Sequence, residues 1–151
     1  MLPQILLAED SDDDAELAIG ALGEYRRVYD VVLVNNGAEA LDYLFRRGSF
    51  AGRAGSNPIL LMLDVKMPKV SGLEVLRQIK GDPALARIPV VVISSSYEDA
   101  DLKEANKLGA SAYVVKPVRF QDFVAAVKTI GNFWGVLNIL PNEQHKYRAK
   151  R

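Results

Sequence analysis

Short, uninterrupted apolar segments recur along the chain and are separated by segments of a different spacing. Five of the apolar segments have the length of a strand, at residues 5–8, 31–34, 59–63, 90–93 and 113–115. None of the five alternates polar with apolar residues. This pattern is typical of strands in a parallel sheet that is covered on both faces.

Between these segments the apolar residues recur every three or four positions, which predicts helices. The expected helices lie near residues 15–22, 38–45, 73–79 and 99–108, and a long fifth stripe runs from Phe120 to Leu137. Strand–helix alternation repeated five times predicts an α/β fold with right-handed crossovers. We therefore expect a flavodoxin-like (βα)5 fold: a doubly wound, five-stranded parallel sheet in the order 2-1-3-4-5 with an extended C-terminal helix or arm.

Length and composition limit the classes of protein that are possible. The 151 residues suit one domain, which we expect at 1–131, with an extended loop at 48–58. Residues 132–151 are expected to form a C-terminal extension, made of a helix continuation and a basic tail. No separate output domain is expected. There is no cysteine, and the one histidine is His145 in the tail. Disulfides, thiolate zinc sites and histidine-based triads in the folded body are therefore excluded.

Charge and hydropathy argue against nucleic acid and membranes as partners. Lysine plus arginine balance aspartate plus glutamate at 19 each, whereas a nucleic-acid binder usually carries a basic face. The N-terminus has no basic segment of the kind found in signal peptides, and no stretch approaches the ~20 apolar residues of a membrane span. We expect a cytoplasmic protein.

Polar side chains directly follow four of the five expected strands. Glu9 and Asp10 follow the first, Asp64 the third, Ser94 lies at the end of the fourth and Lys116 follows the fifth. In an open parallel sheet, functional groups gather beyond the carboxyl ends of the strands. The sequence therefore predicts that three carboxylates, a hydroxyl and an ammonium converge on one patch.

Each of these residues also has an ordinary structural explanation. In the acidic run 9–14, Ser11 can cap a helix, and the three aspartates 12–14 suit the positive end of the helix dipole. That explanation does not cover Glu9 and Asp10, which repel each other unless a hard cation such as Mg²⁺ neutralises them. Asp64 as a turn residue and Lys116 as a solvated lysine are each plausible alone, but not together.

The predicted patch has the composition of a phosphoryl-transfer site. The Asp64 carboxylate can attack phosphorus, while a metal ion and the Lys116 ammonium neutralise the developing charge. The Ser94 hydroxyl can donate a hydrogen bond to a phosphoryl oxygen.

Four segments that carry these residues resemble response regulator receiver domains of the chemotaxis type. They are AEDS at 8–11, LDVKMPKVSGLEVL at 63–76, VVISSS at 91–96 and GASAYVVKP at 109–117, and the resemblance spans residues 4–130. It implies a phosphoprotein of two-component, phosphorelay signal transduction that accepts a phosphoryl group from a histidine kinase. Such a chain is not an enzyme, although it assists its own phosphorylation and dephosphorylation.

The resemblance also implies a metal site for Mg²⁺ or Mn²⁺ around the phosphoacceptor, Asp64. Asp10 would be a direct ligand beside Asp64, the backbone carbonyl of Lys66 would be the third protein ligand, and Glu9 would act through water. Two positions depart from the commoner pattern. Position 9 is Glu rather than Asp, and Lys66 places a long cation beside the acceptor.

The resemblance also implies a residue that binds the phosphoryl group and two residues that change conformation on phosphorylation. Lys116 would bind the phosphoryl group, and its bond to Pro117 would be cis. Ser94 and Tyr113 occupy the places of the switch hydroxyl and the switch aromatic. Ser94 would move toward the phosphoryl group and Tyr113 would turn inward, which remodels the face formed by the fourth helix and the fifth strand.

Three features are similar to response regulators paired with bacterial phytochrome histidine kinases. They are the loop at 48–58, the segment GDPALARIP at 81–89 and the segment NFWGVLNILP at 132–141. The partner would then be a phytochrome-type kinase, with a histidine phosphotransfer protein as a possible downstream partner. Surplus apolar surface at a chain end usually marks a partner face. We expect a homodimer through an arm that contains Phe133, Trp134, Leu137 and Leu140.

Three other functions fit the residues less well. A haloacid-dehalogenase-like hydrolase needs a second Asp two residues after its nucleophile, where this chain has Lys66. A nucleotide- or flavin-binding module needs a phosphate loop, but the first loop here is acidic. A degenerate receiver that acts only as a protein-interaction module is the main alternative, and it is disfavoured because every chemical position is filled.

Overall fold

The computed structural model describes residues 2–95 and 99–130. In it, five strands form one parallel sheet: β1 (Gln4–Ala8), β2 (Asp30–Val34), β3 (Leu60–Asp64), β4 (Val90–Ser94) and β5 (Ala112–Val115). Their order is β2-β1-β3-β4-β5. The expected strand order of the flavodoxin-like fold is confirmed, and each expected strand differs from the observed one by two residues at most.

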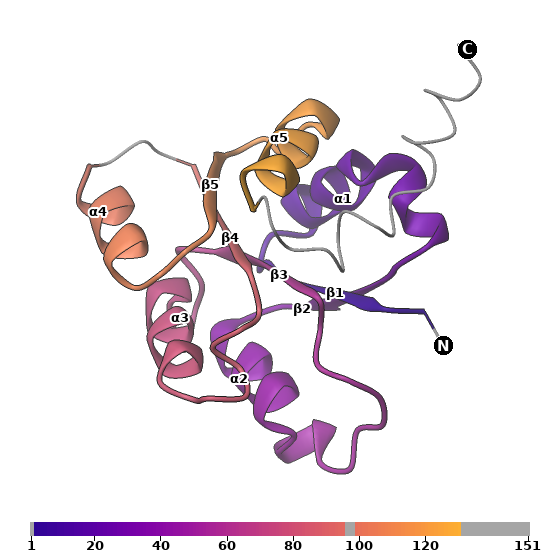
Figure 1. Ribbon diagram of the computed structural model, residues 1–151, viewed down its shortest axis with the longest axis vertical. Coiled ribbons are helices and arrows are strands. Elements are labelled where there is room, and N and C mark those ends of the chain that lie inside the picture. Colours follow the sequence, from indigo (N-terminus) through magenta and orange to yellow (C-terminus); the bar gives the residue numbers. More distant parts are fainter. Residues whose placement is uncertain (1, 96–98, 131–151) are drawn as a thin grey trace.

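In the described residues, four α-helices and two short 3₁₀ helices connect the strands, and a fifth α-helix follows β5. The α-helices are α1 (Asp12–Ala21), α2 (Gly37–Phe45), α3 (Gly72–Lys80), α4 (Asp99–Lys107) and α5 (Phe120–Ile130). The 3₁₀ helices are η1 (Gly23–Arg27) and η2 (Gly48–Phe50). The helices form two layers: α1 and α5 cover one face of the sheet, while α2, α3 and α4 cover the other (Figure 1).

Side-chain caps fix where three of the helices begin. Ser11, Asn36 and Ser71 each accept a hydrogen bond from the backbone N–H three residues later, at the start of α1, α2 and α3. A cap of this kind satisfies one of the four backbone donors that a helix leaves unpaired. The cap predicted for Ser11 is confirmed, and α1 therefore begins shortly after the end of β1.

The central strands are fully buried, whereas the edge strand β2 is not. Every residue of β3 and β4 is buried. In β2, by contrast, Asp30 is exposed and Leu33 is 38% exposed. The expectation that all five strands are covered on both faces is therefore wrong for β2. The apolar run at 31–34 looks like a central strand, but among the described strands it lies at the edge and pairs only with β1.

The loop between α2 and β3 is held by two arginines. Arg46 adopts a left-handed backbone conformation, and its guanidinium donates to the backbone carbonyls of Arg53 and Gly55. The Arg53 guanidinium lies 3.9 Å from the centre of the Tyr43 ring and donates to the Tyr43 carbonyl at 3.0 Å. The expected extended loop is thus fixed onto α2 by hydrogen bonds and a cation–π contact.

Candidate functional site

The parallel register brings the predicted polar residues to one edge of the sheet. Ala8 pairs with Leu63, so Glu9 and Asp64 follow at the same level on neighbouring strands. Ser94, the last residue of β4, pairs with Val115, and Lys116 comes next. The convergence of these side chains at the carboxyl ends of the strands is present in the structure.

Asp64 is a buried carboxylate, with 3% of its surface exposed. Its Oδ1 accepts the backbone N–H of Lys66 at 3.3 Å, and its Oδ2 accepts a hydrogen bond from Lys116 Nζ at 3.1 Å. Burial and the negative charge of Glu9 raise the pKa of Asp64 to about 7, against the opposing effect of Lys116. The folded protein therefore holds this carboxylate at a free-energy cost when it is ionised.

Lys116 lies among three carboxylates. Its Nζ is 2.8 Å from Glu9 Oε1, 3.0 Å from Asp14 Oδ2 and 3.1 Å from Asp64 Oδ2. Burial alone would lower the pKa of Lys116, but the hydrogen bonds to the three acids outweigh burial and raise it. The ammonium stays charged and offsets part of the negative charge. Its peptide bond to Pro117 is cis, as the resemblance implies.

Glu9, Asp10 and Asp64 form a cluster of oxygen ligands. One carboxylate oxygen from each lies within 4.8 Å of the others; Glu9 and Asp64 are buried, while Asp10 is exposed. Glu9 Oε2 accepts a hydrogen bond from the backbone N–H of Ser11 at 3.1 Å, which helps to fix the side chain. Carboxylate oxygens at this spacing, with one side open to solvent, suit a hard divalent cation such as Mg²⁺.

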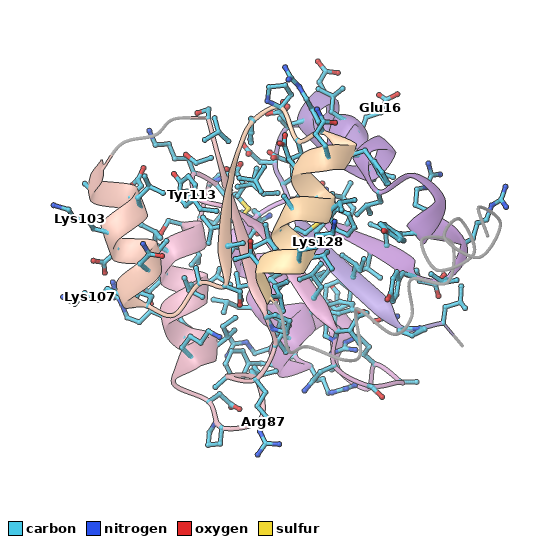
Figure 2. The ribbon with its side chains drawn as sticks, turned by 45° about the horizontal axis from the view of Figure 1, so that its top comes forward. Glu16, Arg87, Lys103, Lys107, Tyr113 and Lys128 are labelled. Carbon is cyan, nitrogen blue, oxygen red and sulfur yellow. The ribbon has the colours of Figure 1, made fainter. Side chains whose placement is uncertain are left out.

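The two predicted switch residues lie on neighbouring strands. Ser94 is buried with 1% of its surface exposed. Tyr113 is half-buried and packs against the apolar cluster beneath α2, α3 and α4. Figure 2 shows it at β5 on the side that faces α4. This placement is compatible with the expected switch.

Asp14 belongs to this site although the sequence pattern does not single it out. The acidic run assigns it to the helix dipole, and it does lie in the first turn of α1. However, its carboxylate also contacts Lys116. The signal that could have found it is its position five residues after Glu9, in the helical turn that follows the end of β1.

Four predicted residues of the dimer arm, Phe133, Trp134, Leu137 and Leu140, lie outside the described residues. So do the extension at 132–151 and the continuation of the fifth helix beyond Ile130. Within the part of the chain that the structure describes, no helix combines the length and apolarity needed to cross a membrane.

Comparison with known proteins gives consistent matches over most of the chain. A family model described as the response regulator receiver domain matches residues 5–128. The probable methanogenesis regulatory protein FilR2 of Methanothrix harundinacea is 38% identical over 130 residues, which cover 86% of this chain and 82% of that protein.

Solved structures give the same result. The bacteriophytochrome response regulator AtBRR is 46% identical with a TM-score of 0.80, covering 89% of this chain and 96% of its own. RtBRR, also a bacteriophytochrome response regulator, is 46% identical with a TM-score of 0.81, and the match covers 99% of this chain and 93% of RtBRR. The Mn²⁺-bound response regulator Rcp1, of Synechocystis, is 32% identical with a TM-score of 0.72, covering 87% and 94%. This chain therefore belongs to the response regulator receiver domain family and is related to phytochrome-associated regulators.

Proposed function

We propose that this chain is a cytoplasmic response regulator that accepts a phosphoryl group on Asp64 from a histidine kinase, in a magnesium-dependent reaction. The observation that carries the proposal is the position of Asp64. Its carboxylate lies at the end of a buried strand, in contact with Lys116 and within 4.8 Å of oxygens from Glu9 and Asp10. A nucleophilic carboxylate, a cation and a pair of metal-binding acids are the groups that phosphoryl transfer to an aspartate requires.

The residues fit a divalent metal, with Asp10 and Asp64 as direct ligands and Glu9 acting mainly through water. The backbone carbonyl of Lys66 would complete the set of protein ligands. When bound, Mg²⁺ or Mn²⁺ supplies positive charge that offsets the charge of the phosphoryl oxygens. The Mn²⁺-bound form of Rcp1 supports a divalent-cation site in this chain by similarity.

The transfer itself is a displacement at phosphorus. An oxygen of Asp64 forms a bond to phosphorus, the phosphorus–nitrogen bond of the donor phosphohistidine breaks, and its electron pair stays on the imidazole nitrogen. Lys116 holds its ammonium 3.1 Å from Asp64 Oδ2, where it can neutralise a phosphoryl oxygen. The chain is thus a phosphoacceptor that assists its own phosphorylation and dephosphorylation, rather than an enzyme that acts on an outside substrate.

The phosphorylated state would switch a protein-interaction face. A phosphoryl group adds charge and strong acceptor oxygens beside the buried hydroxyl of Ser94. Ser94 would move toward it, and Tyr113 would turn into the space that Ser94 leaves. This couples the phosphoacceptor to the surface formed by α4 and β5.

The proposed partners follow from the relatives. The kinase would be of the phytochrome type, because AtBRR and RtBRR are bacteriophytochrome response regulators. A histidine phosphotransfer protein is a second candidate partner. We also propose a homodimer that forms through the C-terminal arm. This part of the proposal rests on the apolar sequence of the arm, which lies outside the described residues.

Phosphotransfer from an autophosphorylated phytochrome-type kinase tests the pairing. Because specificity is a difference between the affinities for two partners, we expect transfer about tenfold faster than from a histidine kinase with an unrelated sensor. Rapid-quench gels would measure both rates, and Asp64→Asn should accept no label from either kinase. Equal rates from the two kinases would contradict the phytochrome pairing while leaving the phosphoacceptor role intact.

A further inference from the structure

Asp14 contacts the phosphoryl-binding lysine without belonging to the metal cluster. Its Oδ2 is 3.0 Å from Lys116 Nζ, and the contact joins the first turn of α1 to the segment between β5 and α5. The Asp14 side chain is 35% exposed, whereas those of Glu9 and Asp64 are 1% and 4% exposed. Asp14 is therefore the outermost of the three acids around Lys116.

The Lys116 ammonium has three N–H donors and three carboxylate partners. In the proposed function, two of those partners change their role. Asp64 binds the metal and then carries the phosphoryl group, and Glu9 faces the same metal. Of the three acids, Asp14 alone keeps a carboxylate for Lys116 throughout the reaction.

We propose that Asp14 is a positioning residue for Lys116: it holds the ammonium at the edge of the site when metal and phosphoryl group take over Glu9 and Asp64. This inference rests on the proposed function. One N–H of Lys116 stays on Asp14, which leaves the other two N–H groups for phosphoryl oxygens. The ammonium thus keeps its charge beside Asp64 without competing with the metal for the same oxygens.

Asp14 should therefore favour metal binding. A cation that enters the cluster repels the Lys116 ammonium and competes with it for Glu9 and Asp64, and Asp14 gives the ammonium a remaining partner. Without that carboxylate, Lys116 stays between Glu9 and Asp64, and the metal has to compete with it. Removing the Asp14 charge should weaken Mg²⁺ binding before any phosphoryl group is present.

A general effect of charge near the site must be separated from this specific role. Asp13 precedes Asp14 in the first turn of α1 and is exposed. Asp13→Asn makes the same change in net charge as Asp14→Asn. If Asp14 acted only through the helix dipole or through screened long-range attraction, the two variants would behave alike.

The test is the dissociation constant of Mg²⁺, measured by isothermal titration calorimetry on the full chain. We expect Asp14→Asn to raise the constant roughly fivefold, because a direct ion pair is lost, and Asp13→Asn to raise it less than about twofold. Asp14→Glu should restore most of the affinity. In a Lys116→Gln background, Asp14→Asn should change the constant by less than about twofold, since the residue through which Asp14 acts is gone.

Two results would overturn the inference. Equal effects of Asp13→Asn and Asp14→Asn would assign Asp14 to general electrostatics. A fivefold effect of Asp14→Asn that persists in the Lys116→Gln background would show that Asp14 does not act through Lys116. If the wild type binds no Mg²⁺ and takes up no phosphoryl group, the proposed function itself fails, and the inference falls with it.

Discussion

Gly72→Ala is expected to destabilise the protein by roughly 3 kcal/mol and to disturb the phosphoacceptor. Gly72 is the first residue of α3, and its backbone N–H donates to the Val65 carbonyl at 2.8 Å. A Cβ at this position would lie 2.0 Å from the carbonyl oxygen of Asp64 and 3.0 Å from the Cα of Val65. These are backbone atoms of a buried strand end, so they cannot rotate away as a side chain can. The turn after Asp64 would have to move.

Gly20→Ala is the matched control, because it adds the same methyl group where there is room for it. Gly20 lies in α1, and a Cβ added there would have no heavy atom of another part of the chain within 4 Å. Alanine there should stabilise the protein by about 0.5–1 kcal/mol, since glycine is unfavourable inside a helix. Urea denaturation measures both variants. An unchanged midpoint for Gly72→Ala would contradict the close approach of α3 to the end of β3.

Asp64→Asn is expected to stabilise the metal-free protein at pH 8 by on the order of 2 kcal/mol. The pKa of Asp64 is about 7 in the folded protein and 3.8 in the ordinary, solvated state. Between these values the folded state binds more protons than the unfolded state. The stability of the wild type therefore falls as the pH rises from about 4 to about 7, and asparagine removes this loss. The pKa of about 7 already includes the opposing effect of the Lys116 contact.

Chemical denaturation at pH 5 and at pH 8, in the presence of a chelator, measures this effect. The difference between Asp64→Asn and the wild type should be clearly smaller at pH 5, where only part of the loss has occurred, than at pH 8. Asp13→Asn, which removes an exposed carboxylate, should change stability by less than about 0.5 kcal/mol at either pH. The prediction would be contradicted if the free energy of unfolding changed by the same amount from pH 5 to pH 8 in the wild type and in Asp64→Asn. Ionisation of Asp64 would then not destabilise the folded protein.

The strands and most of the site are predictable because their signals are local. Five apolar runs mark the strands, and the residue after each run can be read directly. The carboxyl ends of parallel strands meet at one edge, so Glu9, Asp64 and Lys116 can be placed together from the sequence. Ser11 is predictable as a cap because its hydrogen bond closes within three residues.

Other features depend on contacts that no local pattern reveals. Asp14 and Lys116 are 102 positions apart, and the acidic start of a helix already explains Asp14. The exposure of Leu33 depends on β2 lying at the edge of the sheet, which an apolar run cannot indicate. Gly72 looks in the sequence like an ordinary residue at the start of a helix. Only the packing of that turn against Asp64 makes a side chain intolerable there.

Intact mass after incubation with acetyl phosphate tests the phosphoacceptor assignment most directly. The wild type and Asp64→Asn would each be incubated with and without Mg²⁺ and quenched rapidly. The proposed function predicts one phosphoryl adduct on the wild type with Mg²⁺, and none without the metal or on Asp64→Asn. An adduct of equal yield on Asp64→Asn, or on the wild type in the presence of a chelator, would contradict it.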